Sequence, residues 1–232
     1  MAEIFKMHRP YNYTLLILLI ALTFGCGTTE YLTSKRNINE VKHILLFPPI
    51  TEINVIYRGD KHEKSDLFSD IASQEIVRQL KIILPDTIGV SQFDTDSNHL
   101  KEINNTAIQL IKSTESGRTI KGLKVPELLL HQLDSTNHDF GLFIFIIGFT
   151  RTKENLTKEY IRRQGISLAT LGFYQTVPNS SYSTMIGFII DRKNKSLAMY
   201  RKIKWKERDP TDKLVVKSQL RDLLMRYFQS AK

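Results

Sequence analysis

The densest group of metal-binding side chains lies in the middle of the chain. His131, Asp134 and His138 follow one another at spacings of three and four, and Asp139 comes directly after them. On a continuous helix these side chains share one face, as an imidazole and carboxylate metal site requires. The polar residues 135–137 predict instead that the helix ends before His138. We therefore expect a solvated helix end there, with no metal and no cofactor.

Other catalytic signatures are missing from the sequence. It contains no G-x-S-x-G elbow, no phosphate-binding loop and no dinucleotide glycine fingerprint. Asp191 is a single carboxylate that acid–base chemistry could use, but an Asp beside Arg192 is more typical of a turn cap. We expect a protein that is not an enzyme and has no catalytic residues.

The only cysteine, Cys26, follows a short apolar segment. Lys6 and Arg9 precede an unbroken apolar run at Leu15–Leu22, and the small residue Gly25 comes directly before the cysteine. A basic start, a short apolar run and a small residue are typical of a secretory signal peptide. Because a membrane-spanning helix needs about 20 apolar residues, this run is too short to span a bilayer.

The segment Leu22-Thr23-Phe24-Gly25-Cys26 resembles a bacterial lipobox, although Phe24 is bulkier than the usual residue. The resemblance implies cleavage between Gly25 and Cys26, a diacylglycerol thioether on the cysteine, and a fatty acid such as palmitate on its new amine. An uncleaved signal anchor and a secreted protein with an incidental cysteine are the alternatives. Because Gly27 rather than Asp follows the cysteine, the resemblance favours the outer membrane, with the domain facing the periplasm.

Removal of residues 1–25 leaves one domain-sized chain with a basic surface. The formal net charge of +9 falls to +8 once Lys6, Arg9 and Glu3 are lost. Export excludes nucleic acid as a partner, so the charge indicates anionic lipid, acidic cell-wall polymers or acidic proteins. The basic residues are spread along the chain, and an ordinary solvated surface explains them equally well.

Hydrophobic patterning predicts a lipidated cysteine and flexible tether at residues 26–40, and a periplasmic-type α/β domain at 41–232. The predicted strands are 44–47, 53–57, 88–93, 140–149, 183–191 and 196–205. The predicted helices are 67–84, 100–116, 125–133 and 156–171, with a last helix that begins at Asp209-Pro210 and buries Leu214. Residues 58–64 are expected to be a charged loop, and 192–195 a hairpin turn. This order predicts a single α/β domain with a mixed, partly antiparallel sheet flanked by helices.

The order of elements is similar to that of a group of periplasmic lipoprotein domains. A first strand ends at Phe47-Pro48-Pro49, an apolar central strand lies at Gly141–Phe149, and a late strand ends at Ile189-Ile190-Asp191 before a basic turn and Leu197–Tyr200. These features resemble curli-secretion and penicillin-binding-protein-activator lipoproteins, which share a fold with the N-terminal domain of the Tol translocation protein. The resemblance implies an envelope adaptor or assembly factor. Residues 151–181 lack the alternation that a β-barrel pore would need.

The segment around residues 160–182 carries the residues best suited to bind a partner. Aromatic and arginine side chains dominate the binding energy of protein interfaces. The candidate patch consists of Arg162, Arg163, Phe173, Tyr174, Pro178 and Tyr182. The alternative is that the aromatic side chains cap one end of the core.

These observations together predict a lipid-anchored, non-catalytic envelope protein that acts through protein contacts. We expect it to contact the membrane through Cys26 and to bind another envelope protein. A homo-oligomer is a further possibility. A module that binds cell-wall glycan or a small ligand is the alternative, and the positive charge is its only support.

Overall fold

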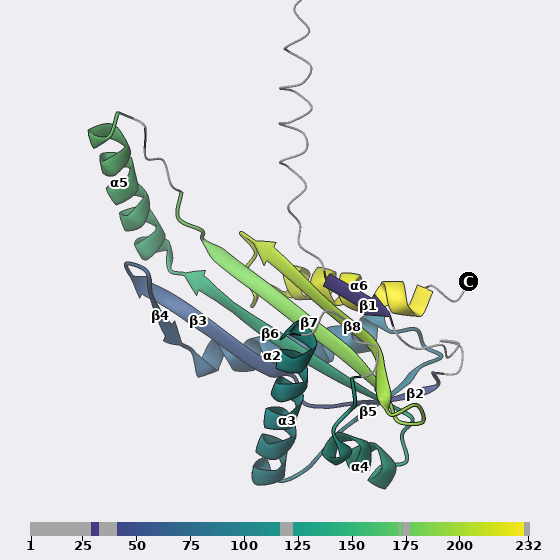
Figure 1. The fold of residues 1–232 in the computed structure, drawn as a ribbon. Helices are drawn as coiled ribbons and strands as arrows, with labels where there is room; N and C mark the ends of the chain where they lie inside the picture. Colours follow the sequence, from purple (N-terminus) through teal and green to yellow (C-terminus); the bar gives the residue numbers. More distant parts are fainter. Residues whose placement is uncertain (1–28, 33–40, 117–122, 172, 174–176, 230–232) are drawn as a thin grey trace, which may run out of the picture.

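The computed structural model describes residues 29–32, 41–116, 123–171, 173 and 177–229 (Figure 1). The strands of this part are β1 (Thr29–Leu32), β2 (His43–Leu46), β3 (Ile50–Arg58), β4 (Lys61–Lys64), β5 (Gly89–Gln92), β6 (Phe140–Arg151), β7 (Ser181–Asp191) and β8 (Ser196–Lys206). The helices are α2 (Asp66–Ile83), α3 (Ser97–Ser116), α4 (Glu127–Ser135), α5 (Lys153–Ala169) and α6 (Lys213–Gln229). The predicted fold class is confirmed: one α/β domain has a mixed sheet flanked by helices.

The sheet is built around β6. On one side β6 pairs antiparallel with β7, which pairs antiparallel with β8, and β1 completes that edge. On the other side the first half of β6 pairs parallel with β2 and the second half with β3. Pro48 and Pro49 separate β2 from β3, because proline cannot donate a hydrogen bond to a ladder. Two successive strands therefore share one long neighbour, and β5 and β4 lie beyond them.

Helices cover the two faces of the sheet unequally. Helices α2 and α6 pack on one face against Leu142, Ile144 and Ile146 of β6. Helices α3 and α4 pack on the other face against Phe143 and Phe145, at the end of the sheet where β6 begins (Figure 1). The predicted burial of this strand on both faces is confirmed from Phe140 to Ile146.

Helix α5 has a different position from the other four. Figure 1 shows it projecting past the end of the sheet, beside the hairpin of β3 and β4. Thr152 caps its first turn by accepting a hydrogen bond from the Asn155 backbone N–H. Only Asn155, Glu159 and Ser167 of this helix are buried.

Three local predictions were wrong. The expected charged loop at 58–64 contains β4, which pairs with β3 around a turn at Gly59, whose φ is +56°. The last helix begins at Lys213, because Asp212 rather than Asp209 accepts hydrogen bonds from the first-turn backbone. That start leaves Leu214 65% exposed instead of buried.

The N-terminal strand differs from the expected tether. Residues Thr29–Leu32 lie within the segment 26–40 predicted to be flexible, and they pair with Met199–Lys202 of β8. Polar, aperiodic sequence predicted no element here because a four-residue edge strand needs no apolar pattern of its own.

Candidate functional site

The His131, Asp134 and His138 side chains do not share one helix face in the structure. Helix α4 ends at Ser135, as the polar residues after it predicted, so His138 does not share a helix with His131. Asp134 and Asp139 both accept hydrogen bonds from Arg192, at 2.9 and 2.7 Å. Within the described residues, no group of three His, Cys, Asp or Glu side chains is placed to hold a metal ion.

Asp191 caps a turn in the structure. Its carboxylate oxygens accept hydrogen bonds from the Asn194 backbone N–H at 3.1 Å and the Asn194 side-chain amide at 2.7 Å. The carboxylate is fully buried at the end of β7. This geometry matches the turn-cap interpretation, since both of its oxygens are engaged in holding the β7–β8 hairpin.

The structure places the residues of the candidate patch in different environments. Pro178 is buried, whereas Phe173 is 92% exposed. The ring of Tyr182 is half-buried and stacks on Phe149, with ring centroids 6.2 Å apart. Tyr174 lies outside the described residues. Each of the two alternatives, a surface patch and a cap on the core, thus applies to part of the segment. Pro178 and Tyr182 belong to the end of the core, and Phe173 belongs to the surface.

The two arginines of the patch are engaged within α5 and with the neighbouring turn. Arg162 donates two hydrogen bonds to the Glu159 carboxylate, at 2.9 and 2.6 Å. Arg163 lies 3.8 Å from the same carboxylate and 3.5 Å from Asp60 in the β3–β4 turn. Arg163 therefore helps to fix the helix against the hairpin, whereas Arg162 bonds within the helix.

Arg151, at the end of β6, was not predicted and is the centre of this arrangement. Its guanidinium donates to the Gly59 carbonyl at 2.7 Å, the Asn155 side chain at 2.7 Å and the Asn179 carbonyl at 2.9 Å. It also donates to the carboxylate of Asp60. The side chain is only 6% exposed. Four segments of the chain thus meet at one cation, at the base of α5.

This network also sets the charge state of Asp60. The hydrogen bond from Arg151 lowers the pKa of the Asp60 carboxyl below its ordinary value of 3.8, against a smaller raising effect of burial. Asp60 therefore stays ionised at any physiological pH. A charged, multidentate contact of this kind positions the helix more firmly than a neutral hydrogen bond would.

Beyond this base, α5 and the chain after it expose large apolar side chains. Ile161 and Leu168 lie seven residues apart, which puts them on the same face of the helix. They are 65% and 78% exposed, and Leu171 is 88% exposed. We call the exposed apolar residues of this region the α5 surface; they are Tyr160, Ile161, Ile166, Leu168, Leu171, Phe173 and Val177.

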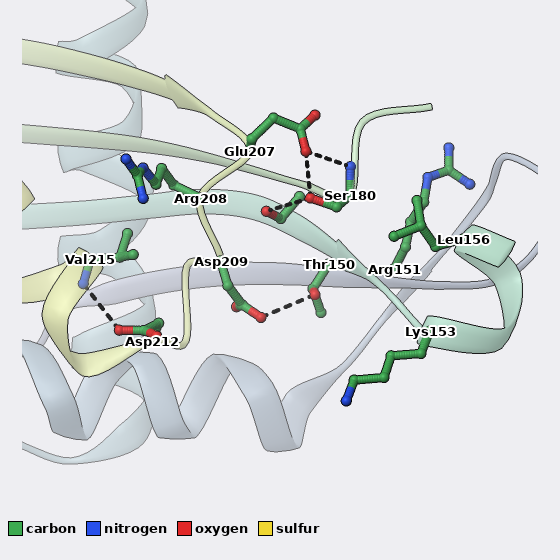
Figure 2. Close-up of a pocket in the computed structure, with 11 residues that line it drawn as sticks. Thr150, Arg151, Lys153, Leu156, Ser180, Glu207, Arg208, Asp209, Asp212 and Val215 are labelled. Atoms are coloured by element: carbon green, nitrogen blue, oxygen red, sulfur yellow. Dashed lines mark hydrogen bonds between the residues drawn. The ribbon is translucent and has the colours of Figure 1, made fainter. Parts of the chain in front are cut away.

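A cleft of about 360 Å³ lies at the end of β6, lined by the start of α5 and by the loop before α6 (Figure 2). Its polar lining is engaged internally: Asp209 accepts a hydrogen bond from Thr150 at 3.1 Å, and Glu207 accepts one from Ser180 at 2.5 Å. Asp212 caps α6. These carboxylates hold the loop before α6 in place, and their arrangement shows no paired acid and base directed at one point.

Arg151 was not predicted from the sequence, because it does not belong to a cluster of functional residues along the chain. Of its partners only Asn155 is close in sequence, whereas Gly59, Asp60 and Asn179 lie 28 to 92 residues away. The sequence offered one signal for Arg151, which is its place at the end of an apolar strand. A cation buried there needs several hydrogen-bond acceptors.

No helix in the described part of the chain is both long enough and apolar enough to cross a membrane. The predicted signal peptide at 1–25 and the lipid site at Cys26 lie outside the described residues.

Comparison with known proteins gives likeness of structure alone. No family model and no curated protein matches this chain. Among solved structures, PelC from Paraburkholderia phytofirmans, a dodecamer, is 9% identical with a TM-score of 0.39 and covers 85% of this chain and 94% of its own. A DUF4136 family protein from Bacteroides thetaiotaomicron is 7% identical with a TM-score of 0.32, covering 87% of this chain and 96% of its own.

A hypothetical protein from Chlamydia trachomatis is 13% identical with a TM-score of 0.35, and covers 82% of this chain and 93% of its own. These three structures do not include the curli-secretion, penicillin-binding-protein-activator or Tol domains that the sequence resembles. At such identities and scores the likeness assigns neither a function nor the role of any residue to this chain.

Proposed function

We propose that this chain is a lipid-anchored, non-catalytic cell-envelope protein that acts as an adaptor or assembly factor by binding another envelope protein through the α5 surface. The observation that carries the proposal is the projection of α5 past the sheet with a run of exposed apolar side chains. Contiguous exposed apolar side chains on a globular protein are typical of interaction sites.

The base of α5 supports this role. Arg151 and Asn155 both bond to the Gly59 carbonyl, and Arg163 contacts Asp60, so the helix is fixed at its first turns before any partner arrives. A pre-positioned helix loses less conformational entropy on binding than a flexible segment does. Binding energy from Ile161 and Leu168 is therefore spent less on ordering the helix than it would be on a segment without a fixed base.

The chemistry of the α5 surface defines the partner. Ile161 and Leu168 would insert into an apolar groove, as amphipathic helices do in helix-in-groove recognition. The charged residues of α5 carry both signs, and two pairs form within the helix, Lys158 with Glu154 and Arg162 with Glu159, each at 2.6 Å. The partner is thus an envelope protein with an apolar groove rather than one with a strongly charged surface.

Two sequence features support the location. The lipobox-like segment ending at Cys26 favours a lipid anchor, and Gly27 favours the outer membrane. The resemblance in order of elements to curli-secretion and Tol-type domains favours an adaptor in the periplasm.

The partner is tested by crosslinking in native envelopes. A photocrosslinking amino acid at position 164, between Ile161 and Leu168 on α5, should give one crosslinked species with a defined protein. Ile161→Glu with Leu168→Glu should abolish it, because two carboxylates would enter an apolar groove. Leu214→Glu is the matched control: Leu214 is as exposed as Ile161, at 65%, but lies on α6.

Three results would contradict the proposal. Crosslinks that survive the α5 double variant would remove the α5 surface from the contact. Crosslinks only to a second copy of this chain would replace the adaptor with a self-assembling protein. Retention on purified cell wall without any crosslinked protein would favour the glycan-binding alternative.

The anchor has a separate test. Cys26→Ser should block lipid attachment, leave the precursor unprocessed by lipoprotein-specific cleavage, and abolish incorporation of radiolabelled palmitate. Unchanged palmitate labelling would exclude Cys26 as the lipid site.

A further inference from the structure

A second cleft lies on the sheet face that α3 covers only in part. Its floor consists of Phe145 and Ile147 of β6 and Ile186 of β7, and its wall consists of Ile108 and Ile111 of α3. Its volume is about 340 Å³, within the range of small-molecule sites. Ile147 is 44% exposed on a strand whose preceding residues are buried, so the floor is open to solvent.

Strand register brings lysines to the edge of this floor. Ile186 pairs with Phe145 on one side and with Lys202 of β8 on the other. Thr184 likewise lies between Ile147 and Lys204. Directly paired residues of neighbouring strands point to the same face. One side of the apolar floor is therefore lined by lysine side chains.

The cleft carries excess positive charge. Lys202 is paired with Glu115 of α3, and Glu115 also accepts a hydrogen bond from Tyr200 at 3.1 Å. That carboxylate is thereby satisfied. Lys112 of α3 and Lys204 also line the cleft, and the described residues provide no ion pair for either. Lys204 also interacts electrostatically with Glu115, so the two lysines add positive charge beside the apolar floor without a close ion pair among the described residues.

Apart from the charged groups at its edge, the cleft offers few hydrogen-bonding side chains, the hydroxyls of Tyr182 and Thr184. In this region β6 lies between β3 and β7, and β7 lies between β6 and β8, so their backbone groups are used in the ladders. A peptide laid on the floor would leave its own N–H and C=O groups unpaired, at considerable cost. A hydrocarbon chain has no such groups to satisfy.

We propose that this cleft binds a single-chain anionic amphiphile, a fatty acid, with the acyl chain on the floor of Phe145, Ile147 and Ile186 and the carboxylate at Lys112 and Lys204. This inference is independent of the proposed protein partner, because the cleft and the α5 surface use different residues.

The test is photolabelling of the full-length chain in its native membrane. The probe is a 12-carbon fatty acid with a diazirine near its tail and a terminal alkyne. Adducts should map to the peptides that contain Ile108 and Ile147. An amine with the same chain and diazirine should label these peptides much less, because its head group would meet Lys112 and Lys204.

Matched variants distinguish the effect of the lysine charges from the effect of the cleft shape and from nonspecific labelling. Lys112→Glu with Lys204→Glu should lower the labelling about tenfold, whereas the Arg variants of both lysines should keep it. Ile147→Trp should abolish labelling by filling the cleft with a ring. Lys101→Glu, the same charge change at an exposed position of α3 away from the cleft, should leave the adducts unchanged.

Two results would overturn the proposal. Equal labelling by the acid and amine probes, or labelling unchanged in the double Glu variant, would show partition onto apolar surface without a site. Displacement of the probe by an acidic peptide but not by excess unlabelled dodecanoate would identify a protein segment as the occupant. Circular dichroism of each variant establishes that loss of labelling is not loss of fold.

Discussion

At the scale of single residues, Arg151 does more for the placement of α5 than any residue of the helix itself. Its four hydrogen bonds join the end of β6 to the β3–β4 turn, to Asn155 and to the chain before β7. Because the side chain is almost fully buried, loss of the guanidinium removes the donor of the Asn179 carbonyl and leaves the Gly59 carbonyl with only the hydrogen bond from Asn155.

Arg151→Ala should therefore lower the free energy of unfolding by about 2–4 kcal/mol. Arg151→Lys should recover only part of this loss, because an ammonium group cannot reproduce the planar geometry of the guanidinium. Urea unfolding at pH 7 measures both. A change below about 0.5 kcal/mol for the Ala variant, typical of a surface substitution, would contradict the buried network.

A pH dependence follows from the pair of Arg192 with Asp139. The hydrogen bond from Arg192 lowers the pKa of the Asp139 carboxyl below 3.8, against a smaller opposing effect of burial. A carboxyl whose pKa is lowered by folding stabilises the native state above its unfolded pKa. That contribution is lost as the pH falls through the lowered value.

Arg192→Gln should thus lower the free energy of unfolding by about 1 kcal/mol at pH 7, since the pair is partly solvent-screened. The difference from the unchanged protein should shrink progressively as the pH falls below 3.8. Chemical unfolding across pH 2–7 measures it. A difference that is the same at both ends of this range would show that Asp139 is not the partner that matters.

At the scale of elements, two glycines show where backbones must approach closely and where they need not. A Cβ on Gly148 of β6 would lie 2.3 Å from the Tyr182 backbone oxygen and 3.0 Å from Pro210. A Cβ on Gly165, within α5, would meet nothing within 4 Å. The same substitution should have opposite effects at the two positions.

Gly148→Ala should lower the free energy of unfolding by about 3 kcal/mol, because strand β7 would have to shift. Gly165→Ala should raise it by about 0.5–1 kcal/mol, because alanine restricts the unfolded chain and favours helix. Thermal and urea unfolding of the two variants side by side give the comparison. Loss of stability in Gly165→Ala would mean that this part of α5 packs against something.

The elements that sequence predicted well are those with a strong apolar pattern. The spacing of Ala72, Ile76 and Leu80 and the stop at Pro85 predicted α2, and the apolar run after Asp139 predicted β6. The turn strand β4 has only charged and polar residues, Lys61–Lys64, so no apolar period marked it. The start of α6 was misplaced for another reason, because both Asp209 and Asp212 are good caps. In the structure Asp209 bonds to Thr150 and Thr211, and Asp212 caps the helix.

The candidate site was predictable only in part. Phe173 is exposed as the patch interpretation requires, whereas burial of Pro178 and the stacking of Tyr182 on Phe149 depend on contacts across the sheet. The lysine-lined cleft was not predictable, because its residues come from α3, β6, β7 and β8 and meet only through strand register.

At the scale of the whole molecule, stability is distributed unevenly between the sheet and α5. Strands β6 and β7 are paired on both sides and covered by helices, whereas α5 packs mainly on β3 and buries three residues. Local opening costs least where few apolar contacts are lost.

Native-state hydrogen exchange should therefore show fast exchange for the amides of α5 beyond Glu159 and the slowest exchange for β6 and β7. Arg151→Ala should accelerate exchange in α5 more than in the sheet. Equal protection of α5 and β7 would contradict a helix fixed only at its base.

The pairing of β1 with β8 changes how far the domain would stand from a bilayer. Thr29 is three residues from Cys26, and an extended chain spans at most about 3.6 Å per residue. A lipid on Cys26 would therefore hold the edge of the sheet within about 11 Å of the membrane surface. A flexible tether that extended to residue 40 would have allowed a distance of about 50 Å between the domain and the membrane surface. A short tether would raise the effective concentration of the domain at the bilayer. It would also limit the domain to partners that lie in a thin layer above the membrane surface.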